Sequence, residues 1–197
     1  MKRTLCATGL ALLLAQTAHA QDGAYFGLGV GANFNTAVSD TVPSFVATST
    51  DAALALTAGY RWQQMGAGYW GVEVNLDFAS GELMADGSQD ACTDVSPDWC
   101  NIDTVARLRA TYSHGMGDGS MLMGSFGLAA VRGRLEQNPS EYVDATGTGL
   151  SLGIAWEKPF GDRAMRFDLN YDVINEDDHP TYPRELDIIG IRASYMF

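Results

Sequence analysis

The chain has 197 residues, a length that suits a single domain. Its formal net charge is −12, from 12 Lys and Arg against 24 Asp and Glu. Residues 1–20 hold Lys2 and Arg3 and no acid, so without them 12 − 2 = 10 basic side chains face 24 acidic ones, and Lys158 is the one remaining lysine. Binding to a phosphate backbone needs clustered Lys and Arg, so this composition argues against nucleic acid as a partner.

The first 20 residues show the three parts of a secretory signal peptide. Residues 1–3 are basic, residues 5–15 are largely apolar, and residues 18–20 follow the small-x-small cleavage pattern. The apolar run is well short of the ~20 residues that a membrane-spanning helix needs. Cys6 lies too early for a lipid anchor at the cleavage point. We therefore expect cleavage after Ala20 and export of residues 21–197 as one domain.

From residue 24 onward, segments of about ten residues alternate between apolar and polar or small side chains. A period of two is that of a β-strand, whose successive side chains point to opposite faces. The clearest example lies between Trp70 and Phe78, where five bulky apolar residues alternate with polar or small ones without a break. The pattern predicts eight strands, at about residues 24–34, 54–62, 70–78, 102–113, 121–131, 149–156, 165–173 and 186–197.

The connections between these segments alternate in length. Short ones, rich in glycine and polar residues, are expected at residues 63–68, 114–119 and 158–163. Long and mostly acidic ones are expected at residues 35–51, 80–101, 133–145 and 175–185. Tight turns at one end and long loops at the other are typical of an outer-membrane barrel, and an even strand number puts both termini at the turn end. The fold predicted is all-β, an eight-stranded antiparallel up-and-down transmembrane β-barrel.

The polar parity of the strands carries charges of both signs. Facing lipid, each basic side chain would cost about 2–4 kcal/mol at mid-depth, whereas inside a narrow barrel the charges can pair with one another. A soluble lipocalin-like barrel would instead hide its apolar face inside. We therefore expect an inward charge network of Arg61, Glu73, Asp77, Asp103, Arg107, Arg109, Arg166, Asp168, Asp172 and Arg192.

The positions of the aromatic residues and of several glycines are also typical of a membrane barrel. Aromatics near the segment ends suit the girdles at the two lipid–water boundaries. These are Tyr60, Trp62, Tyr69, Trp70, Phe78, Tyr112, Trp156, Tyr195 and Phe197. Several glycines share the inward parity and would leave some room in a lumen that eight strands otherwise just fill. These are Gly27, Gly29, Gly31, Gly149, Gly153 and Gly190.

The chain resembles the small eight-stranded outer-membrane barrels of Gram-negative bacteria, the OmpA/OmpX-like family, over residues 21–197. The resemblance rests on the signal peptide, the strand count, the loop asymmetry and the terminal Ser194-Tyr195-Met196-Phe197. It implies an outer-membrane location, contact with outer-membrane lipid and lipopolysaccharide, and assembly by the barrel-assembly machinery. In that family the aromatic C-terminal strand is the segment that this machinery reads, which would assign the assembly signal to Tyr195 and Phe197.

Cys92 and Cys100 remain after the signal is removed, in an acidic segment. In an oxidising compartment, a disulfide is the favoured interpretation of such a pair. A metal site is the alternative, but no histidine lies nearby and two thiolates alone make a poor zinc site. We expect neither a metal nor a cofactor.

The sequence shows no pair of residues suited to catalysis. Ser113 and His114 fall in a predicted turn far from outer-leaflet substrates, and His179 lies in an acidic loop where a solvated histidine is the ordinary interpretation. The acidic residues 175–178 offer oxygen ligands for a divalent cation, but a solvated charge run is the more common case. We expect no enzymatic activity.

The favoured function is an integral outer-membrane barrel with a structural or surface-interaction role through its extracellular loops. Two alternatives stay open, a narrow channel for small or hydrophobic solutes and an adhesin or host-interaction protein. The identity of a loop partner depends on loop conformation, which composition does not determine.

Overall fold

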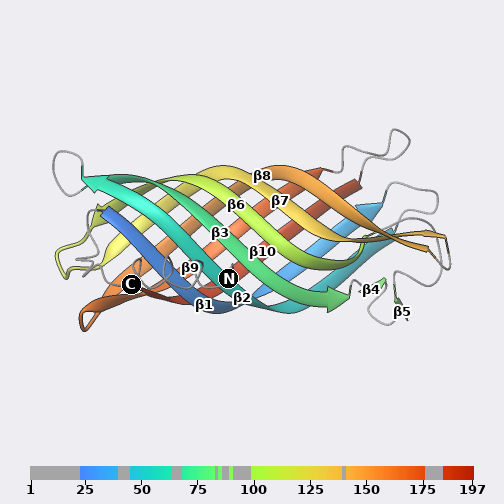
Figure 1. Ribbon diagram of the computed structural model, residues 1–197, viewed down its shortest axis with the longest axis horizontal. Helices are drawn as coiled ribbons and strands as arrows, with labels where there is room; N and C mark the ends of the chain where they lie inside the picture. Colours follow the sequence, from blue (N-terminus) through green and yellow to red (C-terminus); the bar gives the residue numbers. More distant parts are fainter. Residues whose placement is uncertain are drawn as a thin grey trace, which may run out of the picture.

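The computed structural model describes residues 23–39, 45–63, 68–82, 84–85, 89–90, 99–138, 141–175 and 184–197. Its strands are Gly23–Ser39 (β1), Phe45–Gln63 (β2), Gly68–Glu82 (β3), Met84–Ala85 (β4), Gln89–Asp90 (β5), Trp99–Gly115 (β6), Met121–Asn138 (β7), Glu141–Phe160 (β8), Arg163–Asn175 (β9) and Arg184–Met196 (β10). Eight long strands pair antiparallel in the order β1-β2-β3-β6-β7-β8-β9-β10, and β10 pairs with β1 to close the ring. The predicted eight-stranded antiparallel barrel is confirmed (Figure 1).

One end of the barrel, here called the turn end, carries tight connections. Between β6 and β7 the amide of Met116 donates to the carbonyl of Ser120 at 2.7 Å, and Gly119 turns the chain with a φ of +80°. Between β8 and β9 only Gly161 and Asp162 intervene, and Gly161 has the positive φ that the favoured two-residue hairpin turns require. The C-terminus lies at the same end (Figure 1).

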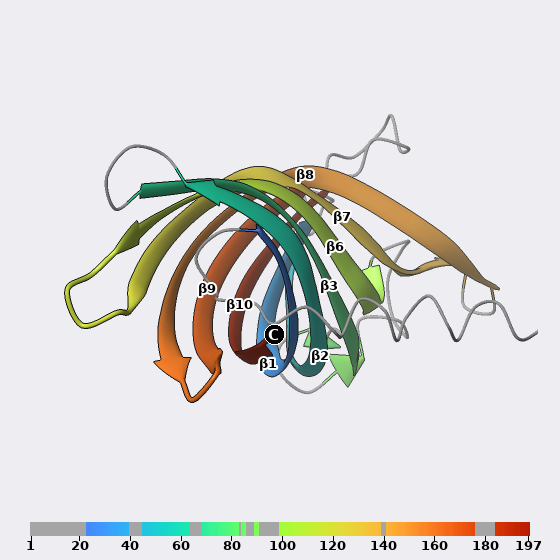
Figure 2. The ribbon, with the colours of Figure 1, turned by 60° about the vertical axis from the view of Figure 1, so that its left-hand side comes forward.

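The opposite end, here called the loop end, differs from the prediction. Residues 35–51 and 133–145 are not loops throughout, because β1 and β2 pair as far as Ser39 with Phe45, and β7 and β8 as far as Asn138 with Glu141. Both views show β7 and β8 reaching beyond the other strands (Figures 1 and 2). Residues 80–101 also include β4 and β5. These extensions lack the apolar alternation because the part of a strand that lies beyond the hydrocarbon core of a bilayer does not need an apolar face.

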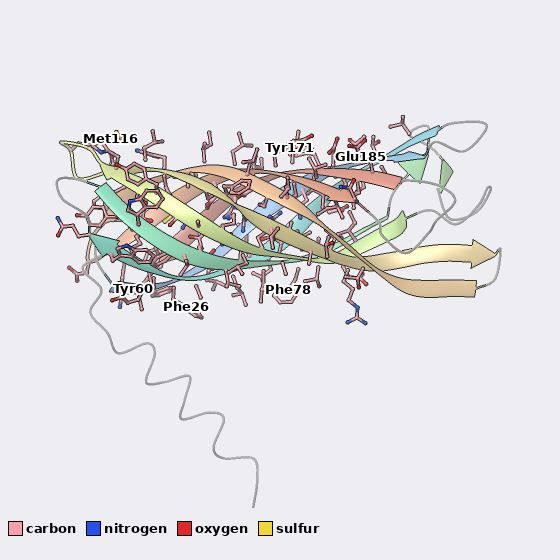
Figure 3. All side chains as sticks on the ribbon, turned by 90° about the horizontal axis from the view of Figure 1, so that it is seen from above. Phe26, Tyr60, Phe78, Met116, Tyr171 and Glu185 are labelled. Carbon is pink, nitrogen blue, oxygen red and sulfur yellow. The ribbon has the colours of Figure 1, made fainter. Side chains whose placement is uncertain are left out.

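The outward face of the barrel is apolar, as the parity argument requires. Phe26, Phe78 and Tyr171 project away from the barrel in Figure 3 and are each about 40% exposed, at 39%, 44% and 41%. Large apolar side chains with similar exposure occur on every long strand. For a free-standing soluble domain such a surface would drive association, whereas in a bilayer it contacts acyl chains. The described residues contain no helix that is long and apolar enough to cross a membrane.

Candidate functional site

The lumen holds most of the buried polar side chains, and its first layer lies at the turn end. Arg61 on β2 and Glu157 on β8 form a bidentate ion pair, in which Nη1 donates to Oε1 at 3.0 Å and Nη2 donates to Oε2 at 2.6 Å. The guanidinium of Arg61 also lies 4.2 Å from the ring centre of Tyr25. The phenol end of that ring lies over Gly59, where a Cβ atom would come within 2.3 Å of it, so the glycine is what allows the tyrosine to pack this closely against the wall.

The second layer is centred on the carboxylate of Glu73. It accepts hydrogen bonds from Tyr25 Oη at 2.8 Å and from Arg109 Nη2 at 2.9 Å, and it pairs with both terminal nitrogens of Arg166. Arg166 also bonds to Asp168, with Nη2 2.7 Å from Oδ1. Arg109 further donates to the side-chain oxygens of Asn75 and Asn170. Glu73, Arg109 and Arg166 are therefore each met by several partners, the condition under which buried ion pairs are tolerated.

A third layer lies toward the loop end and is centred on Arg107. Its guanidinium pairs with Asp77 and also with Asp172, to which Nη2 approaches within 2.6 Å. Asp77 accepts a second bond from Arg192 Nη1 at 3.0 Å. These side chains come from β3, β6, β9 and β10, so the pairs tie the wall together across the lumen.

An apolar layer covers the charges on the loop side. Its members are buried, point inward and touch one another, in contrast to the ionic layers below them. They are Ala37, Ile102, Val105, Ala129, Val131, Ile174, Leu186 and Ile188. This layer was not predicted from the sequence, although Val105 shares the parity of Arg107 and Ile188 shares that of Gly190.

The structure brings nine of the ten proposed lumen charges into the interior, namely Arg61, Glu73, Asp77, Arg107, Arg109, Arg166, Asp168, Asp172 and Arg192. Asp103 differs: it is half-buried, at an irregularity in the pairing of β6 with β7 between Ile102 and Thr104. Glu157 was missed, although it continues the inward parity of Ser151 and Ala155 and could have been found from it. The inward residues Asn35 and Asp51 were missed because they were assigned to a loop.

Aromatic side chains gather at the turn end on the outer wall. Trp70 lies 5.1 Å from Tyr112 between ring centres, and Trp156 lies 5.9 Å from Phe167. Tyr69 is a correction to the predicted girdle: it is buried, because it has the parity of Gly71 and Glu73 rather than that of Trp70. An aromatic near a strand end is therefore assigned to the girdle only when its parity also agrees.

The two residues of the proposed assembly signal lie at the barrel seam. Tyr195 and Phe197 pack edge to face with ring centres 5.0 Å apart, and Arg163 lies 5.3 Å above the Phe197 ring. The backbone of Phe197 exchanges two hydrogen bonds with Phe26 on β1, at 2.7 and 3.3 Å. Phe197 thus takes part in closing the barrel. Recognition of Tyr195 and Phe197 by the barrel-assembly machinery stays a prediction.

The candidates for catalysis and metal binding have separate outcomes. Ser113 is buried in the lumen while His114 is exposed on the outer face of β6, so these neighbours point apart and cannot form a nucleophile–base pair. His179 and residues 176–178 lie outside the described residues, as does Cys92, and nothing is described of the Cys100 side chain. The disulfide stays a prediction. Within the described ranges no three His, Cys, Asp or Glu side chains group as a metal site.

The chain was compared with models of known protein families. Residues 8–197 match the model of the outer membrane protein beta-barrel domain. The chain belongs to this family. The membership agrees with the closed ring, the apolar outer wall and the ionic lumen, and it makes the chain an outer-membrane barrel. No curated protein matches the chain in sequence.

Solved structures of small outer-membrane barrels share the fold. The outer membrane protein OprG from Pseudomonas aeruginosa superposes with a TM-score of 0.55 at 16% identity, covering 92% of this chain and 98% of that one. Ail, the attachment invasion locus protein of Yersinia pestis, superposes with a TM-score of 0.50 at 13% identity, covering 89% and 99%. At these identities the likeness shows the fold alone.

Proposed function

We propose that this chain is a non-conducting outer-membrane barrel whose role is structural and whose loop end provides a surface for contacts outside the cell. The observation that carries the proposal is the filled lumen. Three layers of paired charges and one apolar layer occupy the space through which a solute would pass. With eight strands, a barrel interior is just wide enough for side chains to fill.

The same observation argues against the channel alternative. An ion that entered from the turn end would have to separate Arg61 from Glu157 and then pass the apolar side chains around Ile188, which cannot replace its hydration shell. Buried side chains with 0% exposure, such as Ile174 and Val131, leave no open path there.

Planar-bilayer recording tests the closed lumen. The purified, folded protein, checked by heat-modifiable gel mobility, should add no conductance above the bare bilayer at any voltage. As a matched comparison, the double variant Ile188→Gly plus Val131→Gly removes two members of the apolar layer and should conduct more than wild type. Regular unitary currents from the wild-type protein would overturn the proposal.

The contact role rests on the projecting β7–β8 hairpin. Its pairing continues from Arg132↔Thr146 to Asn138↔Glu141, beyond the apolar band of the outer wall. Such a raised two-stranded platform suits binding to another macromolecule, and Ail, which shares this fold, is named for attachment and invasion. We place the contact surface at this hairpin and expect partners to be bound there.

A shortened hairpin tests this role without disturbing the barrel. Replacing residues 135–143 by a two-residue turn should leave heat-modifiable mobility unchanged and should lower adherence of protein-coated beads to immobilised extracellular-matrix proteins. The control variant is Asp118→Asn, in the turn at the opposite end. Equal adherence of wild type, shortened variant and uncoated beads would remove the contact role and leave the structural one.

A further inference from the structure

Four polar side chains on adjacent strands β1 and β2 form a cluster inside the loop end, separate from the ionic layers. Asn33 lies opposite Asp51 in the pairing, and Asn35 lies opposite Ser49. All four have the inward parity, and Asn33, Asn35 and Asp51 are at most 3% exposed. Residues directly opposed in an antiparallel pair have Cα atoms about 4.5–5.5 Å apart, so the four residues lie close together. The amide oxygen of Asn33 lies on the side of β10, 3.0 Å from where a Cβ at Gly190 would be.

Asp51 is the one buried charge in the described lumen that the ion pairs leave uncompensated. The buried charged residues of the described chain are five arginines and six carboxylates. Every one of the arginines pairs with a carboxylate other than Asp51, and the remaining five carboxylates are all paired. The part of the interior that the structure describes therefore carries one negative charge in excess, and that charge is at Asp51. A carboxylate buried without a counter-charge costs several kcal/mol.

Among the described neighbours of Asp51, more acceptors than donors are left without a partner. Asn35 Nδ2 donates to Asp51 Oδ2 at 2.6 Å and to Ser49 Oγ at 2.8 Å, and Ser49 Oγ lies 3.1 Å from the same carboxylate oxygen. Within the described structure, Asn35 Oδ1 and both amide atoms of Asn33 have no hydrogen-bond partner. Buried polar groups left in this state each cost about 1–3 kcal/mol.

We propose that Asp51, Asn33, Asn35 and Ser49 form a binding site for one monovalent cation of the size and oxygen preference of Na⁺. A single positive charge balances the single excess negative charge, whereas a divalent ion would leave the interior positive. A bound proton would also balance the charge, but one proton satisfies one acceptor. One cation is coordinated by several oxygen atoms at the same time. Carboxylate, amide and hydroxyl oxygens are the ligands that hard cations prefer.

The surroundings of the cluster favour the same assignment. Asn35 lies opposite Ile188, and Ala37, two residues further along β1, lies opposite Leu186. Both of these partners belong to the apolar layer. Water is displaced on that side, which strengthens the attraction between a cation and the carboxylate. The site does not depend on whether the barrel binds partners through its hairpin.

Thermal unfolding of the full exported protein in lipid nanodiscs tests the site. Stability is compared in NaCl and in N-methylglucamine chloride at the same ionic strength and pH. A cation that binds only the folded state raises Tm with its concentration, by about 3–5 °C for each tenfold increase above its Kd. Asp51→Asn should abolish this difference. The matched control is Asp187→Asn, whose carboxylate accepts a bond from Tyr171 on the outer wall and which should respond to Na⁺ as wild type does.

Three results would overturn the assignment. Wild-type protein could unfold at the same temperature in both salts, Asp51→Asn could keep the Na⁺ response, or CaCl₂ at equal ionic strength could stabilise the protein more than NaCl. Should Asp51→Asn fail to fold, wild-type crystals soaked in Tl⁺ decide the matter. An anomalous peak bonded to Asp51 supports the site, and the lack of one contradicts it.

Discussion

Arg61 and Glu157 join opposite walls of the barrel. They lie on β2 and β8, and three strands separate these in either direction around the ring. Their two parallel contacts, at 3.0 and 2.6 Å, therefore cross the full width of the lumen. Arg166 on β9 and Glu73 on β3 are related in the same way. Charges 96 and 93 residues apart in the chain thus hold the circular cross-section.

Breaking the Arg61–Glu157 pair from one side should destabilise the barrel strongly. Glu157→Ala leaves a buried guanidinium without its carboxylate, and we expect a loss of about 3–5 kcal/mol in the free energy of unfolding. Urea titration in lipid, read by heat-modifiable mobility, measures it. Replacing both residues by leucine removes both charges and should cost less than Glu157→Ala alone. The exposed turn residue provides a control, since Asp162→Ala should stay within about 0.5 kcal/mol of wild type.

Two neighbouring isoleucines separate the effect of the lumen from that of the lipid. Ile188 is 0% exposed in the apolar layer, whereas Ile189 is 46% exposed on the outer wall. Ile188→Ala should cost about 2–5 kcal/mol because the packed interior cannot fill the cavity. Ile189→Ala should cost less than half as much, because acyl chains move into the space. Equal losses in the same urea titration would contradict the inside–outside assignment of β10.

The strands, and the side of the barrel on which each side chain lies, could be predicted because apolar and polar or small residues alternate in each segment with a period of two. Parity alone places Arg107 and Arg109 inside and Leu108 outside. Which carboxylate meets which guanidinium could not be predicted, since that depends on how far each strand is shifted against the next around the closed ring. The inward position of Glu157 follows from its parity, which it shares with Ser151 and Ala155.

The loop end shows where the sequence signal stops. Asn33 lies within the predicted strand at residues 24–34, beside the outward Phe34. On β2, Ser49 and Asp51 alternate with outward residues that are not apolar, Thr48 and Thr50, so no apolar face marks that part of the strand. The hydrophobic pattern reports contact with hydrocarbon, and strands that continue above it lack that pattern. The apolar layer was hidden for a related reason: Ile188 and Ile189 are adjacent, and an apolar pair blurs the alternation.

Gly59 and Gly124 offer a test of close packing against the wall. A Cβ at Gly59 would lie 2.3 Å from the Tyr25 ring, whereas a Cβ at Gly124 meets nothing within 4 Å on the outer face. Gly59→Ala should therefore displace Tyr25 from Arg61 and cost about 1–3 kcal/mol. Gly124→Ala should be neutral or slightly stabilising, because alanine loses less backbone entropy on folding. Near-ultraviolet circular dichroism reports the tyrosine environment, and an unchanged spectrum for Gly59→Ala would contradict the packing described.

The turn between β6 and β7 should respond to pH through Asp118. The hydroxyl and the backbone amide of Ser120 donate to Asp118 Oδ1, and these bonds hold the pKa of the carboxyl below its ordinary value. A carboxyl whose pKa is lower in the folded state stabilises that state fully above its unfolded pKa, about 3.9, and loses this contribution as the pH falls through the folded value. Wild type should thus unfold at a higher temperature than Asp118→Ala at pH 6, and the gap should close on acidification below about pH 4. Asp162→Ala, in the other tight turn, serves as the control. A gap that stays constant down to pH 2.5, roughly one unit or more below the ordinary carboxyl value, would show that the bonds to Ser120 do not depend on the charge of Asp118.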